Sequence, residues 1–409
     1  MQETGCRCGA DEGAARIEGE VMPNLSDIVD VAESLEGKAV LPIEKRCVAV
    51  RNRHSTCTRC VDVCIAHAVS VEDNRVSIDS GACVACGACT AVCPTEALVP
   101  IDPTDDRLAE AAASTAASLG GKTAVFACAR MAARNIGDPD KYVAVPCLGR
   151  MEESLLVQLV AHGVSDVVLV DGVCKTCKFG GTDAATSEAV ASANALLAAQ
   201  GSSVRVRRVS EFPAEAVEET GRKSRAAARR GFFTQAGSMA KDAVKTAAEH
   251  AIDDTFGKKE KPLNLRELLR TDDEGNLPQA EQTRHMAILD AMDAIGRSVV
   301  PEITTRLFGS VSIDESKCRA CGMCTVFCPT GALKKSDEKP ACGVGSYLEF
   351  QALDCVQCNL CADTCLQKCI EVSPTVSTDE LFDFEPRLIH LPEPPARGTL
   401  LSRIKGLSH

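Results

Sequence analysis

The chain has 409 residues, 24 cysteines and a formal net charge of −12, with no tryptophan and only two tyrosines. Its length exceeds that of one ordinary domain, and its acidity and lack of stacking aromatics argue against nucleic-acid binding. The first residues have no apolar signal-peptide core, and no apolar run is long enough to span a membrane. A cysteine-rich chain of this kind is expected in the cytoplasm, where thiols stay reduced and bind metals rather than form disulfides.

Residues 41–105 contain one complete cluster-binding motif and one irregular one. CVACGACTAVCP has the spacing C-x2-C-x2-C-x3-C-P, in which three close thiolates hold one [4Fe–4S] cluster and the fourth cysteine reaches another. Zinc sites favour paired C-x2-C knuckles and fit this triple run poorly. The other run, HSTCTRCVDVC, has His54 in place of the first cysteine. The missing ligand is either Cys47 or His54; all-thiolate ligation is commoner and favours Cys47, whereas a histidine ligand would raise the potential.

These runs resemble the bacterial two-cluster ferredoxin family, and so does the cysteine-rich segment near the C-terminus. The step CPTEAL into a strand matches the family, and AVSVEDNRVSID matches its hairpin, with the turn at Asp73–Asn74. In such a pair, each run lends its fourth cysteine to the cluster of the other. The expected ligand sets are Cys47 (or His54), Cys57, Cys60 and Cys93 for one [4Fe–4S] cluster, and Cys64, Cys83, Cys86 and Cys89 for the other.

Residues 106–213 alternate apolar runs with helical stretches, which is typical of a parallel α/β sheet. The expected strands are TAVFAC, YVAVPC, DVVLVDG and SVRVRRV, and the expected helices are EESLLVQLVAHG and DAATSEAVASANALLAAQG. Four cysteines follow the strands, namely Cys128, Cys147, Cys174 and Cys177. Because ligands bind beyond the carboxyl ends of parallel strands, we expect the four thiols to meet at one edge of the sheet.

The stretch VPCLGRMEESLLVQLVAHGVSDVVLVDGVCKTCKFGG resembles the delta subunit of methyl-viologen-reducing hydrogenase. That family binds a [2Fe–2S] cluster and passes electrons to flavoproteins of the heterodisulfide-reductase type. The resemblance implies that the four cysteines hold a [2Fe–2S] cluster, and zinc is the alternative metal. Arg150, Lys175 and Lys178 are either contacts to an anion or to cluster sulfur, or ordinary surface charges. The segment has no G-x-G-x-x-G or P-loop motif, so no nucleotide site is predicted.

Residues 214–306 predict a helical connector. The stretches SMAKDAVKTAAEHAIDDTF and EQTRHMAILDAMDAIGRSV fit amphipathic helices, and strand signals are almost absent. From residue 376 the sequence, with its LPEPPARG stretch, predicts an extended tail that is a candidate docking segment for a partner.

Residues 307–375 repeat the cluster motif in two complete runs, CRACGMCTVFCP and CVQCNLCADTC. The expected ligand sets are Cys318, Cys321, Cys324 and Cys365 for one [4Fe–4S] cluster, and Cys328, Cys355, Cys358 and Cys361 for the other. Cys369 stands where the other runs have alanine and is expected to be a small buried apolar residue. Cys6, Cys8 and Cys342 receive no role.

The expected fold class is α/β plus α+β. It comprises an N-terminal extension (1–40), a first dicluster ferredoxin-like module (41–105), a small parallel α/β domain like the hydrogenase delta subunit (106–213), a helical connector (214–306), a second dicluster module (307–375) and a C-terminal tail (376–409).

These cofactors predict an electron-transfer subunit rather than a catalytic one. It would relay electrons through four [4Fe–4S] clusters and one [2Fe–2S] cluster, or zinc, within a cytoplasmic oxidoreductase complex of anaerobic metabolism. The implied partners are a heterodisulfide-reductase-type flavoprotein, a molybdopterin or NiFe catalytic subunit, or both. One alternative is a self-contained iron–sulfur oxidoreductase that reacts at the cluster of the α/β domain. Another is a structural protein with zinc in that domain and clusters that serve as folding staples.

Overall fold

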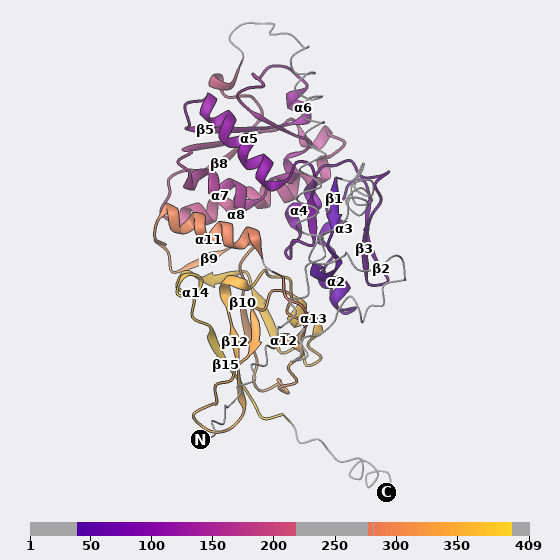
Figure 1. Ribbon diagram of the computed structural model, residues 1–409, viewed down its shortest axis with the longest axis vertical. Helices are drawn as coiled ribbons and strands as arrows, with labels where there is room; N and C mark the ends of the chain where they lie inside the picture. The colour runs from indigo at the N-terminus through magenta and orange to yellow at the C-terminus, as the bar shows by residue number, and fades with distance from the viewer. Residues whose placement is uncertain (1–38, 218–276, 281, 395–409) are drawn as a thin grey trace, which may run out of the picture.

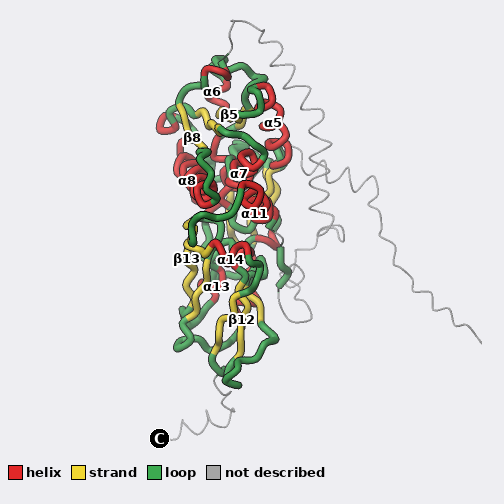
Figure 2. Tube along the Cα trace, turned by 90° about the vertical axis from the view of Figure 1, so that its left-hand side faces the viewer, coloured by secondary structure: helices red, strands yellow, loops and turns green. Residues whose placement is uncertain are grey.

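Residues 39–217, 277–280 and 282–394 are described by the computed structural model (Figure 1). Cys6, Cys8 and most of the expected connector, including its first helix, lie outside these residues. The described chain is elongated, with the α/β domain at one end and the second cysteine-rich module at the other, as the side view in Figure 2 shows. The first module lies beside the junction between them.

A four-stranded parallel sheet forms the centre of the α/β domain and confirms the prediction of a parallel sheet. The strand order is β6-β5-β7-β8, and all three pairings are parallel. The strands are β5 (Thr123–Cys128), β6 (Val143–Val145), β7 (Asp166–Val170) and β8 (Val206–Val209). Both faces of the central strands are covered, which explains why their sequences are continuously apolar rather than alternating.

Helices cover this sheet. They are α5 (Asp105–Ser118), α6 (Ala129–Ala132), α7 (Glu153–Ala161) and α8 (Asp183–Ala199), with the short 3-10 helix η5 (Ala214–Ala216) beyond β8. Residues of α5, α7 and α8 share a core with Phe126 on one face of the sheet. On the other face, Met131 of α6 and Phe212 pack with Val125. Helix α8 ends just before Gly201, whose φ of +69° stops the helix where the sequence predicts its end.

The first module consists of two small antiparallel sheets and short helices. Its strands are β1 (Val40–Pro42), β2 (Val69–Glu72), β3 (Arg75–Ile78) and β4 (Leu98–Pro100), and its helices are η1 (Glu44–Arg46), α2 (Val48–Arg51), α3 (Arg59–Asp62) and α4 (Ala88–Val92). Strand β1 pairs with β4, and β2 pairs with β3. Asp73 and Asn74 both have positive φ, as the two-residue turn of the predicted hairpin requires.

The second module repeats this arrangement. Its elements are β10 (Ser310–Ile313), α12 (Met323–Phe327), β11 (Leu333–Lys335), β12 (Ser346–Phe350), η6 (Ala352–Asp354), α13 (Leu360–Thr364) and β13 (Ile370–Ser373). Strand β10 pairs with β13 as β1 does with β4, and β11 pairs with β12 as β2 does with β3. The internal repeat in the sequence therefore corresponds to a repeat in the structure.

Part of the expected C-terminal tail folds into the second module. Residues 375–391 form β14 (Thr375–Ser377), α14 (Thr378–Phe382) and β15 (Arg387–Leu391). Strand β15 adds to the edge of β12, and β14 pairs with β9 (Glu302–Thr304) from the end of the expected connector. The prediction of an extended tail from residue 376 is wrong for this stretch, because Ile389 and Leu391 are buried against the module.

Helix α11 (Thr283–Ile295) is the described α-helix of the expected connector. It lies between α7 and the second module and buries Ile288 and Met292 in the core that both share (Figure 1). No helix in the described part of the chain combines the length and apolarity that a bilayer crossing requires.

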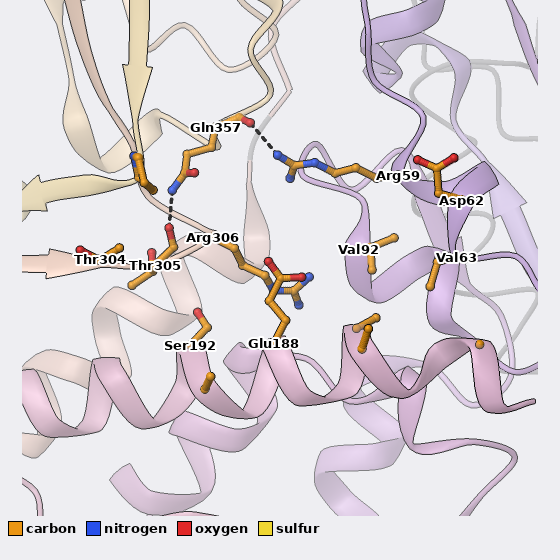
Figure 3. A pocket seen from close by; sticks show the side chains of 15 residues that line it. Arg59, Asp62, Val63, Val92, Glu188, Ser192, Thr304, Thr305, Arg306 and Gln357 are labelled. Carbon is orange, nitrogen blue, oxygen red and sulfur yellow. Dashed lines mark hydrogen bonds between the residues drawn. The ribbon is translucent and has the colours of Figure 1, made fainter. Parts of the chain in front are cut away.

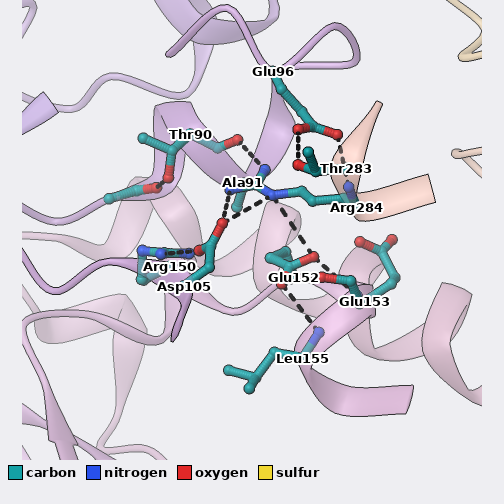
Figure 4. A network of polar contacts seen from close by, with 12 residues as sticks. Thr90, Ala91, Glu96, Asp105, Arg150, Glu152, Glu153, Leu155, Thr283 and Arg284 are labelled. Carbon is teal, nitrogen blue, oxygen red and sulfur yellow. Dashed lines mark hydrogen bonds and ion pairs between the residues drawn. The ribbon is translucent and has the colours of Figure 1, made fainter. Parts of the chain in front are cut away.

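A buried polar network joins α11 to the first module and to the α/β domain (Figure 4). The Arg284 guanidinium donates to Asp105 and to the Thr90 carbonyl, while Glu96 accepts from the Thr283 hydroxyl and the Arg284 backbone N–H. Burial would lower the pKa of Arg284, but the surrounding carboxylates raise it. The junction of the three parts is therefore fixed by compensated charges rather than by apolar packing alone.

Candidate metal centres

Site 1 consists of Cys47, Cys57, Cys60 and Cys93. Burial raises the pKa of Cys47 to about 11 and that of Cys60 to about 12, and the Cys93 thiol adds to both shifts. Burial is also the main cause that raises the pKa of Cys57, and the Cys93 thiol adds a smaller contribution. Cys47 lies at the N-terminus of α2, where the nearby backbone N–H groups of Val50 and Ala49 oppose part of the effect of burial on its pKa. The structure thus brings the irregular run together with one distant cysteine upstream.

His54 does not lie in this group. Its side chain is exposed, and its backbone N–H donates to Asn52 Oδ1 at 2.8 Å, which fixes a tight turn ahead of the irregular run. The sequence left two candidate ligands open. Of these, Cys47 is the one that lies close enough to interact electrostatically with the other three thiols.

Site 2 consists of Cys64, Cys83, Cys86 and Cys89. Burial raises the pKa of Cys89, and the other three thiols of the site raise it further. Two left-handed residues, Ala85 and Gly87, turn the loop between Cys83 and α4. Such turns align successive backbone N–H groups into a concave surface that suits an anion, and a thiolate-ligated cluster is anionic.

The complete cysteine runs share this loop geometry. Left-handed residues precede and follow the second cysteine of each: Ala85 and Gly87, Ala320 and Gly322, Gln357 and Asn359. The irregular run departs from it, because α3 already begins at Arg59. All four runs have a left-handed residue three positions after their last cysteine: His67, Glu96, Gly331 and Lys368. The irregular run therefore keeps the second half of the motif and replaces the first half with Cys47.

Site 3 consists of Cys318, Cys321, Cys324 and Cys365. Burial raises the pKa of Cys324 to about 12, with further contributions from Cys321 and Cys318. Cys321 is exposed, so this site reaches the molecular surface. Cys365 is buried and lies 3.4 Å from a fifth sulfur, that of Cys369.

Site 4 consists of Cys328, Cys355, Cys358 and Cys361. Cys328, Cys355 and Cys361 are buried, and burial raises the pKa of Cys355 to about 12. The Cys328 thiol raises the pKa of Cys355 and Cys358 further, which shows that the last cysteine of the first run lies among the three of the second. This is the arrangement that an exchange of cysteines between the runs requires, and the exchange itself stays a prediction.

Groups of thiols that are mostly buried or partly buried, several of them with raised pKa values, fit iron–sulfur clusters chemically. Without a metal, four close sulfurs in a poorly hydrated site hold their protons, because burial and mutual repulsion both disfavour thiolates. Iron ions supply the compensating positive charge and convert the thiols into thiolate ligands. The cysteines of sites 1 to 4 are consequently better suited to bind [4Fe–4S] clusters than to remain free thiols.

Site 5 consists of Cys128, Cys147, Cys174 and Cys177, which line one cavity of about 450 Å³ beyond the carboxyl ends of β5, β6 and β7. Cys147 precedes the 3-10 helix η2 (Leu148–Arg150), and Cys174 opens η3 (Cys174–Thr176). The Cys147 sulfur lies 3.1 Å from the hydroxyl of Thr182 in η4 (Gly180–Thr182). The four thiols thus converge at one edge of the sheet.

An arginine neutralises the acidic residues beside site 5. Asp171, Cys174 and Asp183 offer ligand atoms within 4.8 Å of one another. Arg208 donates to Asp171 at 2.8 Å and to Asp183 at 2.6 Å, and its Nη2 lies 3.8 Å from the Cys174 sulfur. Arg208 therefore occupies the position that a cation would otherwise take.

The three basic residues near site 5 have different environments. Lys175 and Lys178 are exposed. Arg150 is only 2% exposed and pairs with Asp105, so its interpretation as an ordinary surface charge is wrong. It packs against Gly87 of the first module, and its Nε and Nη1 have no hydrogen-bond partner among the described residues. Its burial arises from domain packing, which the sequence near Arg150 does not reveal.

The five sites form a series. One pair of interacting thiols links each site to the next: Cys324 with Cys361 for sites 3 and 4, Cys358 with Cys57 for sites 4 and 1, Cys89 with Cys60 for sites 1 and 2, and Cys86 with Cys147 for sites 2 and 5. The series therefore runs from the second module through the first module to the α/β domain.

Side chains next to the cysteines hold the two modules together. Arg51 is buried and donates to the carbonyl groups of Pro278, Phe327 and Cys328. Arg59 donates to the Gln357 carbonyl at 2.9 Å across a cleft of about 700 Å³ (Figure 3). Because Arg59 lies between two cysteines of site 1 and Gln357 between two of site 4, this contact fixes the sites side by side.

The comparisons with known proteins agree with the cluster motifs. A family model for the 4Fe-4S binding domain matches residues 76–99 and 311–334. Neither the curated proteins nor the solved structures gave a match to the chain. The matched segments contain one complete cysteine run each, and they support an iron–sulfur electron-transfer role with [4Fe–4S] clusters.

Proposed function

We propose that the chain is an electron-transfer subunit with [4Fe–4S] clusters at sites 1 to 4 and a [2Fe–2S] cluster at site 5. The observation that carries the proposal is the series 3–4–1–2–5, in which the Arg59–Gln357 hydrogen bond holds sites 1 and 4 side by side and the close approach of Gly87 to Arg150 does the same for sites 2 and 5. Bound clusters supply reversible one-electron oxidation and reduction. The residues of the chain set the spacing of the sites, bury them and donate N–H groups to their sulfurs.

The geometry of site 5 supports a cluster rather than zinc. Tetrahedral Zn–S bonds of about 2.3 Å place four sulfurs about 3.8 Å apart. Within the described ranges, the close group of metal-ligating side chains is instead Asp171, Cys174 and Asp183, already compensated by Arg208. The four thiols of site 5 surround a cavity of about 450 Å³, which leaves room for a cluster between them.

The partners proposed are redox subunits that meet the two ends of the series. The resemblance of the α/β domain to the hydrogenase delta subunit favours a heterodisulfide-reductase-type flavoprotein at site 5. The exposed Cys321 makes site 3 the accessible end in the second module, suited to a molybdopterin or NiFe catalytic subunit. Such a chain acts in a cytoplasmic oxidoreductase complex of anaerobic metabolism.

A self-contained oxidoreductase is the second candidate, and the size of the cavity at site 5 favours it. Arg130, Lys178 and Arg208 line the cavity together with the four cysteines and could hold an anionic substrate. Reduction of a small anion by the isolated, loaded chain would distinguish this activity from simple relay.

The first test is the content of iron, acid-labile sulfide and zinc in protein purified without oxygen. About 18 irons per chain without zinc is expected for four [4Fe–4S] clusters and one [2Fe–2S] cluster. About 16 irons and one zinc would overturn the assignment of site 5, and about 12 irons would overturn that of site 1.

The series itself is tested by paramagnetic coupling between reduced clusters. Cys57→Ser should remove the cluster at site 1 and leave two separately coupled groups, sites 3 and 4 and sites 2 and 5. Cys342→Ser is the matched control, because Cys342 is exposed and belongs to no site. If Cys57→Ser leaves every coupling intact, the series is wrong.

A further inference from the structure

Site 3 has a fifth sulfur that the other three [4Fe–4S] sites lack. The Cys369 sulfur lies 3.4 Å from that of Cys365, within the distance of an S–H···S hydrogen bond. Cys318, a second member of the same site, is also close enough to Cys369 to interact with it electrostatically. Both Cys365 and Cys369 are buried, so no water competes for these contacts.

The other cysteine runs provide an internal comparison. Ala68, Ala97 and Ala332 take the position of Cys369, four residues after the last cysteine. The backbone N–H groups of Ala68 and Ala97 donate to Cys64 and Cys93, each at 3.2 Å. Lys368, which precedes Cys369, has a positive φ, as do His67 and Glu96 before the two alanines. The backbone arrangement is therefore shared, and only the thiol is additional.

The direction of the hydrogen bond follows from the proposed role of Cys365. As a ligand of the cluster at site 3, its sulfur is a thiolate, which can accept a hydrogen bond but has no proton to donate. Cys369 is then the group that keeps its proton and donates it.

On the basis of the proposed function, we propose that Cys369 sets the potential of site 3 by donating its S–H to the Cys365 sulfur. A donor to a ligand sulfur stabilises the reduced, more negative state of a cluster, so it raises the reduction potential. Site 4, with Ala332 at the equivalent position, lacks this donor. The donor therefore favours the reduced form of site 3, the end of the series where Cys321 is exposed to a partner.

The proposal is tested on the full-length protein, loaded with clusters without oxygen, by a redox titration monitored by electron paramagnetic resonance. Cys369→Ala reproduces the natural residue of the other runs. We expect the iron content to stay unchanged and the potential of one [4Fe–4S] cluster to fall. A tenfold change in its ratio of reduced to oxidised forms corresponds to about 59 mV for one electron. Cys369→Ser retains a donor and should give a smaller shift.

The reciprocal variant Ala332→Cys places a thiol at the equivalent position beside site 4 and should raise the potential of a different cluster. An unchanged potential in Cys369→Ala with full iron content would overturn the role of Cys369 alone. Loss of about four irons in Cys369→Ala would identify Cys369 as a ligand and also overturn it. A wild-type protein without reducible [4Fe–4S] clusters would instead overturn the proposed function itself.

Discussion

Cys47 stands outside the cysteine run that it completes. It lies at the start of α2, close to the backbone N–H groups of Ala49 and Val50. Arg51, one turn later on the same helix, is tied to the second module. The same short helix therefore supplies a thiol to site 1 and an anchor to site 4.

We expect Cys47→Ser to remove the cluster at site 1, with a loss of about four irons per chain. His54→Ala is expected to leave the iron content unchanged, because His54 is exposed and lies outside the group of thiols. Iron and sulfide analysis of the two purified variants checks this. The reverse result, with iron lost only from His54→Ala, would make the histidine the ligand.

Single residues differ in how far the sequence predicts them. The spacing of the cysteines is enough to predict the cluster-binding motifs, because only cysteines at certain spacings can bind the same cluster. The choice between Cys47 and His54 could not be made from spacing, since it depends on how a loop folds back. The sequence also could not predict the environments of Arg150 and Cys369. Arg150 pairs with a residue that is distant in the sequence, and Cys369 makes its contact within a loop.

The loop before α4 joins the first module to the α/β domain. Gly87 has φ of +74°, and a Cβ on it would overlap the Arg150 side chain of η2. On the facing side, a Cβ on Gly149 would lie 3.1 Å from Ala88. Two glycines therefore allow the backbones beside sites 2 and 5 to approach closely, which brings Cys86 near Cys147.

Gly87→Ala tests this approach. The methyl group must both tolerate the left-handed backbone, at a cost of about 1–2 kcal/mol, and displace Arg150, at a cost of about 1–3 kcal/mol more. Gly120→Ala is the matched control, because Gly120 has φ of +73° and nothing within 4 Å of its added Cβ. Thermal unfolding should therefore show a larger decrease for Gly87→Ala. Equal decreases in the two variants would mean that the interface absorbs the methyl group without cost.

Elements with a strong periodic pattern of apolar residues lie close to where the sequence predicts them. The parallel strands and the turn at Asp73–Asn74 are where their apolar runs and turn residues predict them. Strand β15 was missed because its five residues, RLIHL, lie directly before the proline-rich stretch PEPP. A short edge strand gains its stability from its neighbour β12, and this tertiary contact leaves little trace in the local sequence.

Three parts of the molecule meet around α11. His285 is completely buried there, with Nε2 3.0 Å from the Leu307 carbonyl and Nδ1 without a partner in the described region. Burial lowers its pKa, against the opposing influence of Glu96 and Glu153. The folded protein therefore keeps this imidazole neutral at a pH where the unfolded chain protonates it.

The stability of the whole molecule should consequently fall as the pH drops below the ordinary histidine pKa of 6.5. The unfolded state then binds the extra proton, so the free energy of unfolding decreases by about 1 kcal/mol for each pH unit. Thermal midpoints at pH 7.5 and 5.5 measure this effect, and His285→Gln should show a smaller difference between the two. An unchanged difference in the variant would assign the pH dependence to other groups.

The order of the sites could not be read from the sequence. Each cysteine run predicts its own cluster, but the neighbours Cys57 and Cys358 belong to modules far apart along the chain. Their proximity depends on Arg51, Arg59 and the cleft between the modules, which are contacts of the folded molecule.

The hydrogen bonds of Arg51 to the second module can form only late in synthesis of the protein. Its acceptor carbonyls on Phe327 and Cys328 lie 276 and 277 residues later in the chain. A ribosome adding about 5–20 residues per second delivers them roughly 14–55 s after Arg51 itself. During that interval the nascent first module has its thiols in place while the surface that covers them does not yet exist. Cluster delivery to site 1 is therefore best matched to this window, before the second module closes over it.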